Sequence, residues 1–297
     1  MSMEDLRSVL AQPGLPVTKR PVFIVGSPRS GTTALARALH QHSELWASHE
    51  SYFLHSLLGD GRAVGVYTRQ MDRSAPGWLK TQQVERAEFL GFVGLGINAM
   101  YTSRSGGRRW VEQTPLYTLM VHDLAELFPD ALFLHIVRDG RRVVHSMSNF
   151  LRKFEDRPEA VRHVPAWATD FRDACRTWNR WVATATDFCD ASADRALTVR
   201  NEDLAADPAA GFARILSFLQ VAAENGPADH FASKAVNSSF GETREGAATT
   251  QPWTQWSAEQ RRTFTEEAGE TMHRHGFAAV AELSRWAKDA PVPAATS

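Results

Sequence analysis

The chain has 297 residues, of which 43% are hydrophobic and 23% charged, as is ordinary for a folded globular protein. The length suits one large α/β domain, or one domain with a small helical insertion. The formal net charge of −1 excludes a global electrostatic preference for nucleic acid, a membrane surface or a polyanionic glycan. We therefore expect no nucleic acid among the partners.

Cysteine usage and apolar runs indicate the compartment. Only Cys175 and Cys189 occur, too few to staple a chain of this length, so we expect two buried, reduced thiols. Residues 1–20 contain no apolar segment typical of a secretory signal, and the longest apolar runs are too short for a membrane span. The sequence thus predicts a cytoplasmic protein without a membrane span.

A strand, a short polar loop and a helix are predicted over residues 22–41. Gly26 and Gly31 bound the loop and let the backbone approach an anion, toward which the amide groups at the helix start point. The spacing follows the pattern G-x-x-x-x-G-K-[ST], except that Thr32 stands in place of the lysine. Without that lysine the loop is poorly suited to ATP and Mg²⁺, so it predicts a phosphate site with one cation, Arg29.

The segment after this helix is predicted to be an insertion. A short apolar stretch over 45–47 precedes Ser48-His49-Glu50, and residues 51–109 are expected to form a mostly helical insertion that covers the loop. We expect a single domain over residues 1–297, with its core over residues 20–275 and a frayed tail at its end, residues 291–297.

Strands and helices then alternate along the chain. The predicted strands are 22–26, 110–112, 131–137 and 197–199; the predicted helices are 32–41, 52–58, 84–100, 116–128, 140–153, 166–190, 211–219 and 258–275; and a loop is predicted over 59–65. Such alternation predicts an α/β fold with a parallel sheet flanked by helices. Ligands of such sheets bind beyond the carboxyl ends of the strands.

A second anion site is predicted after the strand over 131–137. Arg138 follows this strand directly, at the end where ligands bind. Ser146 lies eight residues further on, about two turns into the next helix, on the same face as Arg142. Arg138 and Ser146 can clamp a phosphate; alternatively, Arg138 pairs with Asp139 and the two cap the helix. The local sequence leaves both interpretations open.

Two anion sites on one sheet imply a ligand with two separated anionic groups, such as adenosine with a 3′-phosphate and a 5′-phosphosulfate. The chain resembles the sulfotransferases that use 3′-phosphoadenosine 5′-phosphosulfate (PAPS), above all the tyrosylprotein-sulfotransferase-like and bacterial branches. Residues 26–33 resemble that family's 5′-phosphosulfate loop and residues 133–147 its 3′-phosphate motif, and the resemblance covers residues 20–275 in order. It implies a P-loop-type fold, PAPS as co-substrate, adenosine 3′,5′-bisphosphate as product, and no metal.

The resemblance also implies which residues bind PAPS. Arg138 and Ser146 match the pair that holds the 3′-phosphate. Arg244 and Gly246 are carried over from a segment similar to the family's R-K-G element, in which a glutamate here replaces the lysine. Asn201 stands where a related segment usually has a tyrosine that contacts adenine. The residues expected to hold the 5′-phosphosulfate are Ser27, Pro28, Arg29, Ser30, Gly31, Thr32 and Thr33.

Sulfuryl transfer needs a base for the proton of the acceptor hydroxyl, and cations that offset charge on the leaving group. The resemblance implies direct in-line transfer with Glu50 as the base, while Arg29 neutralises the phosphosulfate. His49 is the alternative base, because an ordinary histidine titrates near neutral pH. In an extended segment these two adjacent side chains cannot face the same site.

Gln113 stands where the family often has a lysine that helps hold the transferring sulfate. Glutamine donates hydrogen bonds without charge, so we expect weaker transition-state stabilisation there, or compensation by Arg104, Arg108 or Arg109. Glu112 is expected to pair with one of these arginines rather than to take part in the chemistry.

Two other functions stay open from the sequence. A P-loop nucleotide or nucleoside kinase would need ATP and Mg²⁺, and the missing lysine at Thr32 counts against it. A non-catalytic nucleotide-binding protein would keep the cradle without turnover, and Gln113 and Glu245 are the departures that allow it.

The acceptor is expected to carry a hydroxyl group, on a small molecule such as a phenol, a sugar or a lipid-linked alcohol, with a peptide tyrosine as the alternative. Aromatic residues that could either line an apolar acceptor pocket or belong to the core are Trp46, Tyr52, Phe53, Tyr67, Trp78 and Phe92. The oligomeric state is open, a homodimer being one alternative.

Overall fold

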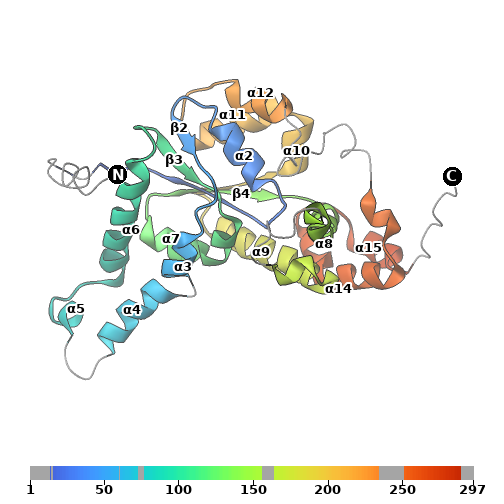
Figure 1. The fold of residues 1–297 in the computed structure, drawn as a ribbon, viewed down its shortest axis with the longest axis horizontal. Helices are drawn as coiled ribbons and strands as arrows, with labels where there is room; N and C mark the ends of the chain where they lie inside the picture. The colour runs from blue at the N-terminus through green and yellow to red at the C-terminus, as the bar shows by residue number, and fades with distance from the viewer. Residues whose placement is uncertain are drawn as a thin grey trace.

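One parallel sheet organises the fold. The computed structural model describes residue 14 and residues 16–59, 61–72, 77–155, 164–233 and 251–288. Within these ranges five parallel strands lie in the order β2-β3-β1-β4-β5 (Figure 1). They are β1 (Val22–Val25), β2 (Leu45–Ala47), β3 (Arg109–Glu112), β4 (Leu132–Val137) and β5 (Ala196–Arg200). The predicted α/β fold with a helix-flanked parallel sheet is confirmed.

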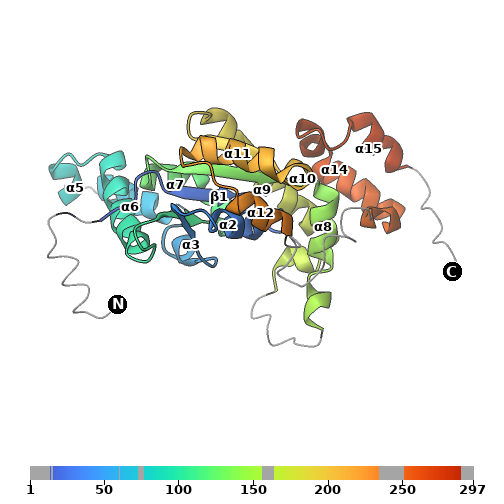
Figure 2. The ribbon, with the colours of Figure 1, turned by 90° about the horizontal axis from the view of Figure 1, so that it is seen from above.

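Helices pack on both faces of this sheet, with α2, α11 and α12 on one face and α6, α7 and α9 on the other (Figure 1). Figure 2 shows α5 and α6 at one end of the molecule and α14 and α15 at the other. The helices are α2 (Thr32–Leu39), α3 (Phe53–Leu58), α4 (Arg62–Met71), α5 (Trp78–Thr81), α6 (Arg86–Thr102), α7 (Val121–Leu127), α8 (Gly140–Ser148), α9 (Phe171–Ala191), α10 (Asn201–Ala206), α11 (Pro208–Leu219), α12 (Gly226–Ser233), α14 (Ala258–Arg274) and α15 (Val280–Trp286), with 3₁₀ turns at Pro115–Met120, Leu151–Phe154, Ala166–Ala168 and Pro252–Gln255. None of the helices described is long and apolar enough to cross a bilayer.

Side-chain alternation along β1 explains why both faces are covered. Phe23 and Val25 join the core cluster beneath α6, α7 and α9, whereas Val22 and Ile24 join the cluster beneath α2, α11 and α12. All four are at most 1% exposed. Burying each such side chain contributes about 1.5–3 kcal/mol, so covering both faces holds β1 at the centre of the sheet.

Several predicted boundaries were wrong. The loop predicted over 59–65 ends early, because α4 begins at Arg62, directly after Gly61 in a left-handed conformation (φ +68°). The helix predicted over 140–153 ends at Ser148. Helices α10, α12 and α15 were not predicted; they have six, eight and seven residues, too few to show a clear helical period in the sequence.

The two cysteines are buried free thiols, as predicted. Burial raises the pKa of Cys175 to about 12 and that of Cys189 to about 11. Because the thiolate is the reactive form, both side chains act as small apolar residues of α9.

A histidine is buried in the middle of the sheet. His135 on β4 is fully buried, and its Nε2 has no hydrogen-bond partner among the residues described. Its Nδ1 lies 3.4 Å from Oγ1 of Thr198 on β5, and its ring centroid lies 6.0 Å from that of His275. Burial lowers the pKa of His135 from 6.5 to about 3, helped by the charges of His275 and Arg274.

We predict that His135 makes the fold acid-sensitive. Below pH 6.5 His135 is protonated in the unfolded chain, but in the folded protein it stays neutral down to about pH 3. The free energy of unfolding therefore falls as the pH is lowered through this range. This one residue contributes a slope of at most about 1.4 kcal/mol per pH unit. Urea unfolding between pH 7 and pH 4 should therefore show a smaller loss of stability in His135→Leu than in the wild type.

The exposed His273 supplies the control, since His273→Leu should keep the wild-type slope. A His135→Leu slope equal to that of the wild type would contradict the prediction.

Candidate active site

The loop between β1 and α2 is a tight cradle that requires glycine at two positions. Gly26 (φ +152°) and Gly31 (φ +104°) adopt conformations that other residues rarely adopt. A Cβ on Gly26 would lie 2.4 Å from the carbonyl oxygen of Ile136, and one on Gly31 would lie 2.5 Å from Nδ2 of Asn201. The hydroxyl of Thr118 accepts a bond from the Gly26 amide (2.8 Å) and donates one to its carbonyl (3.0 Å). The cradle backbone is therefore fixed by its neighbours.

The cradle presents groups that suit an anion. Gly31 caps α2 without a side-chain hydrogen bond, so the first amide groups of the helix face the cradle. Ser30 Oγ is buried and has no hydrogen-bond partner within the described ranges. Arg29 adopts a left-handed φ of +71°, an uncommon conformation for a residue with a side chain. An orphaned hydroxyl, a helix N-terminus and a guanidinium together fit a phosphate or phosphosulfate group.

The structure brings the two predicted anion sites into contact. Arg29 Nε donates to Oγ of Ser146 on α8 (3.1 Å), and Nη1 of Arg138, at the end of β4, donates to the carbonyl of Arg29 (3.3 Å). The Asp139 carboxylate does not form the alternative pair with Arg138. It caps α8 by accepting from the Arg141 amide (2.8 Å) and forms an ion pair with the Arg141 guanidinium (2.7 Å).

Two residues that follow β5 complete this region. Asn201 Nδ2 donates to the carbonyl of Ser30 (3.2 Å), and Oε1 of Glu202 accepts from the amide of Asp139 (3.0 Å). Burial lowers the pKa of Arg138, and the Glu202 carboxylate opposes this shift. Sequence reasoning noted Asn201 only as a departure from a pattern and missed Glu202. Their position directly after a strand, at the ligand-binding edge, is the signal that could have found them.

The positive charge of Arg29 in the cradle acts on the carboxylate of Glu50. Its Oε2 accepts a hydrogen bond from the Tyr52 hydroxyl. Burial raises the pKa of Glu50; the Tyr52 bond lowers it, the Glu112 carboxylate raises it and the Arg29 guanidinium lowers it. The carboxylate is thus partly withdrawn from water and close enough to the cation of the cradle to be influenced by it.

His49 faces different surroundings from its neighbour Glu50. It is exposed and lines a pocket of about 250 Å³ together with Thr33, at the start of α2, and Gln113, just beyond β3. Arg37 and His40 also line this pocket, whose exposed lining surface is more apolar than polar. The pocket adjoins the cradle through Thr33.

Neither Arg108 nor Arg109 supplies the positive charge of the lysine that the family often has at the position of Gln113. Arg108 Nη1 donates to the carbonyl of Leu45 (3.2 Å), and Arg109 Nη1 donates to the carbonyl of Leu219 (2.8 Å). Arg109 begins β3, so both side chains belong to the amino end of the sheet, away from the cradle. The expectation that either compensates for the missing lysine was wrong, because strand direction separates them from the site.

Glu112 also differs from expectation. Instead of pairing with an arginine, its carboxylate accepts hydrogen bonds from the hydroxyls of Tyr101 (2.9 Å) and Thr114 (2.6 Å). It is only 4% exposed, so these bonds lie in the interior.

Aromatic residues expected near the acceptor divide between core and surface. Trp46 and Phe53 pack against the core cluster beneath α6, α7 and α9. The ring of Tyr67 on α4 lies 5.8 Å from that of Phe89 on α6. Trp78 is 70% exposed on α5, a helix that projects from the body of the molecule at the lower left of Figure 1.

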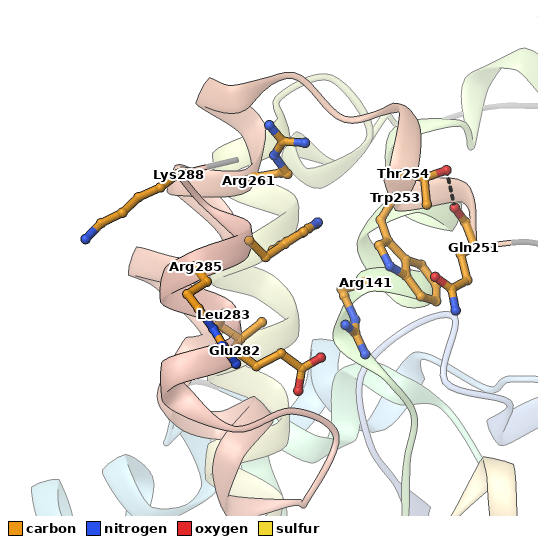
Figure 3. A pocket seen from close by; sticks show the side chains of 10 residues that line it. Arg141, Gln251, Trp253, Thr254, Arg261, Glu282, Leu283, Arg285 and Lys288 are labelled. Atoms are coloured by element: carbon orange, nitrogen blue, oxygen red, sulfur yellow. Dashed lines mark hydrogen bonds between the residues drawn. The ribbon is translucent and has the colours of Figure 1, made fainter. Parts of the chain in front are cut away.

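A larger pocket of about 670 Å³ lies among α8, α14 and α15 (Figure 3). Arg141 lines it, with its guanidinium 4.7 Å from the ring centroid of Trp253. Because Arg141 and Ser146 are five residues apart on α8, they face different sides of that helix, and this pocket is separate from the cradle. Arg244 and Gly246, also expected at the 3′-phosphate, lie outside the described residues.

Comparison with known proteins gives one family. A family model described as "Sulfotransferase family" matches residues 21–225. Protein-tyrosine sulfotransferase A of Caenorhabditis elegans is 29% identical over 231 residues, which cover 74% of this chain and 55% of that protein. The chain spans about half the length of such curated relatives.

Solved structures share the fold. The sulfotransferase domain of the curacin biosynthetic pathway aligns with a TM-score of 0.51 at 19% identity, covering 84% of this chain and 98% of that one. Mouse sulfotransferase SULT7A1, solved in complex with PAP, aligns with a TM-score of 0.51 at 15% identity, covering 97% and 94%. At these identities the likeness establishes the fold alone.

We predict that Gly31→Ala abolishes anion binding in the cradle while the fold survives. The added Cβ would collide with Asn201 in a backbone conformation unfavourable to alanine. Titration with adenosine 3′,5′-bisphosphate should show affinity at least ~10-fold weaker than wild type, the factor that about 1.4 kcal/mol produces. Gly96→Ala on α6, where a Cβ meets open space, is the matched control and should bind as wild type does. Equal affinity in Gly31→Ala and Gly96→Ala would mean that the anion binds elsewhere.

Proposed function

The chain belongs to the sulfotransferase family, and from this premise we propose that it transfers the sulfuryl group of PAPS to a hydroxyl group of an acceptor. The observation that carries the proposal is the contact between the two anion sites: Arg29 bonds Ser146, and Arg138 bonds the backbone of Arg29. A ligand with anionic groups on both the 3′- and the 5′-oxygen of one ribose matches this arrangement, whereas a nucleoside triphosphate carries its charge on the 5′-oxygen alone.

The cradle is proposed to hold the 5′-phosphosulfate. The amide groups at the start of α2 and the buried Ser30 hydroxyl would donate to its oxygens, with Thr32 and Thr33 beside them. Arg29 would offset charge that develops on the departing phosphate. Such preorganised donors and charges usually supply most of the transition-state stabilisation in group-transfer reactions of this kind.

The second site is proposed to hold the 3′-phosphate. Arg138, at the end of β4, and Ser146, on α8, would bind it directly, since both lie beside the cradle. From the sequence resemblance we also propose that Arg244 and Gly246 bind over the same phosphate.

Glu50 is proposed as the general base. The acceptor oxygen attacks sulfur in line with the bond to the leaving phosphate oxygen; the new S–O bond forms as the old one breaks. Glu50 takes the hydroxyl proton, and adenosine 3′,5′-bisphosphate leaves. A carboxylate with a raised pKa is the stronger base for this step. Gln113 is proposed to bind the moving sulfuryl group as an uncharged donor, and no metal is included because Arg29 and α2 supply the positive charge.

A non-catalytic nucleotide-binding protein is the second candidate, favoured by one observation. Gln113 is buried and uncharged, and its Oε1 has no hydrogen-bond partner among the residues described. A protein of this kind would bind PAPS and release it unchanged. A kinase is disfavoured because Thr32 occupies the lysine position.

Several broader features are proposed from the sequence. The chain is taken to act as one domain in the cytoplasm, with residues 51–109 on the acceptor side. The acceptor is a hydroxyl-bearing small molecule, sugar or phenol, with a peptide tyrosine as the alternative. The pocket lined by His49, Thr33 and Gln113 adjoins the cradle and offers a place for the acceptor.

Glu50→Gln tests the proposed chemistry. With ³⁵S-labelled PAPS and a panel of phenol, sugar and tyrosine-peptide acceptors, the variant should transfer sulfate ~10²–10⁴-fold more slowly than wild type. Its affinity for adenosine 3′,5′-bisphosphate should be retained. Glu126→Gln, on the surface of α7, is the control and should transfer at the wild-type rate.

The pH dependence follows from the same group. Because the pKa of Glu50 is raised from 4.5, the base becomes protonated, and activity is lost, as pH falls through a value above 4.5. Two results would exclude Glu50 as the base. One is a loss of kcat/KM on acidification that occurs only at or below pH 4.5, and the other is undiminished transfer by Glu50→Gln.

A further inference from the structure

We propose that Glu112 is a positioning residue whose buried carboxylate anchors two hydrogen-bond chains that hold the backbone around Glu50 in its working conformation. The inference rests on the proposed function and deepens it, since it names what keeps the base in place.

Glu112 is bonded as an ionised acceptor. It ends β3, is only 4% exposed, and receives four hydrogen bonds. Oε1 accepts from the amides of Gln113 (3.0 Å) and Thr114 (2.9 Å) and from the Thr114 hydroxyl (2.6 Å), while Oε2 accepts from the Tyr101 hydroxyl (2.9 Å). With four donors directed at its two oxygens, the carboxyl group has no need of its own proton. Bonds to a charged acceptor are about twice as strong as neutral ones.

The first chain runs through Thr114. A threonine hydroxyl has one proton, and that of Thr114 is donated to Glu112. Its oxygen is then an acceptor, and it receives the amide of Ser51 (2.9 Å). Through the Thr114 hydroxyl, Glu112 is therefore linked to the amide of Ser51, the residue next to Glu50.

The second chain runs through two tyrosines. Tyr101 gives its proton to Glu112, so its oxygen accepts from the Ser51 hydroxyl (2.8 Å). Ser51 Oγ then accepts from the hydroxyl of Tyr117 (2.7 Å), whose oxygen in turn accepts from the amide of Leu54 (3.0 Å). Each hydroxyl in this chain donates once and accepts at least once, so the geometry allows only one set of proton positions while Glu112 is ionised.

Both chains end on the backbone that carries the base. The amides of Ser51 and Leu54 bracket Tyr52, which has a left-handed φ of +54° and bonds the Glu50 carboxylate. Such a conformation costs on the order of 1–3 kcal/mol and persists only where its surroundings hold it. Burial, together with the nearby charge of Glu112, raises the pKa of Tyr117 to about 12, so this hydroxyl keeps its proton for the chain.

Glu112 also acts on Glu50 through space. The charged groups around Glu50 are Arg29, which favours its ionised form, and Glu112, which disfavours it, while Tyr52 donates to it. Removal of the Glu112 charge should therefore lower the pKa of the base. A merely structural residue would leave that pKa unchanged.

Three variants separate the two actions. Glu112→Gln keeps the shape but turns one acceptor into a donor that faces another donor, so one chain must break. Thr114→Val breaks the first chain and Tyr101→Phe the second, and both keep the charge of Glu112; Thr114→Val also removes a hydroxyl that interacts with Tyr117. Glu126→Gln is the surface control.

The kinetic readout is the pH profile of sulfate transfer from PAPS. We expect kcat to fall about 10–100-fold in Glu112→Gln, the size of effect that small misplacements produce, with affinity for adenosine 3′,5′-bisphosphate unchanged. Its acid limb should move to lower pH. In Thr114→Val and Tyr101→Phe, kcat should fall while the acid limb stays in place. The proposal would be overturned if Glu112→Gln kept the wild-type kcat and the acid limb of its pH profile did not move.

The structural readout is independent of activity. Hydrogen exchange of at least one of the Ser51 and Leu54 amides should become faster in Glu112→Gln, and faster at one of the two sites in each milder variant. Wild-type protection of both amides in Glu112→Gln would overturn the anchoring role. Absence of sulfate transfer by the wild type, with accelerated exchange in Glu112→Gln, would refute the proposed function while the anchoring stands.

Discussion

The hydrogen bond from Arg29 to Ser146 joins two anion sites that lie 117 residues apart in the chain. It can form only because β1 and β4 are adjacent parallel strands whose carboxyl ends meet at one edge, in a register that pairs Val25 with His135. β1 delivers the cradle with Arg29 to that edge, and β4 delivers Arg138 and then α8 with Ser146. The helices packed around the sheet, and the glycines that allow a close approach of the backbone, keep the two sites in contact.

Charge is arranged around the junction in two opposed groups. Arg29 and Arg138 lie on the side of β4 and α8, where the guanidinium of Arg138 bonds the carbonyl of Arg29. Glu50 follows β2 and Glu112 ends β3, on the other side of β1, and burial together with the charge of Glu112 raises the pKa of Glu50. In the proposed function the donor binds on the cationic side and Glu50 acts from the anionic side.

Whether a feature could be predicted from the sequence depends on how far apart along the chain its interacting residues lie. The cradle is a strand followed by a loop, and Arg138 directly follows a strand, so both can be recognised from the local sequence. The parallel sheet then brings the two together at one edge. Arg109 was misjudged although the signal was available, because a residue at the start of a parallel strand lies at the edge opposite the ligand. The partners of Glu112 could not be predicted, since Tyr101 reaches it only through the packing of α6 on β3, and Ser51 joins the chain from another segment.

The central claim is that one ligand bridges both anion sites. Calorimetric titration of the wild-type protein with adenosine 3′,5′-bisphosphate, beside adenosine 5′-monophosphate and ATP with Mg²⁺, tests it most directly. We expect the bisphosphate to bind far more tightly than the monophosphate, because only the bisphosphate reaches Arg138 and Ser146. We expect ATP with Mg²⁺ to gain no affinity from its extra phosphates. Equal affinity for the two adenosine phosphates, or preference for ATP with Mg²⁺, would contradict the account.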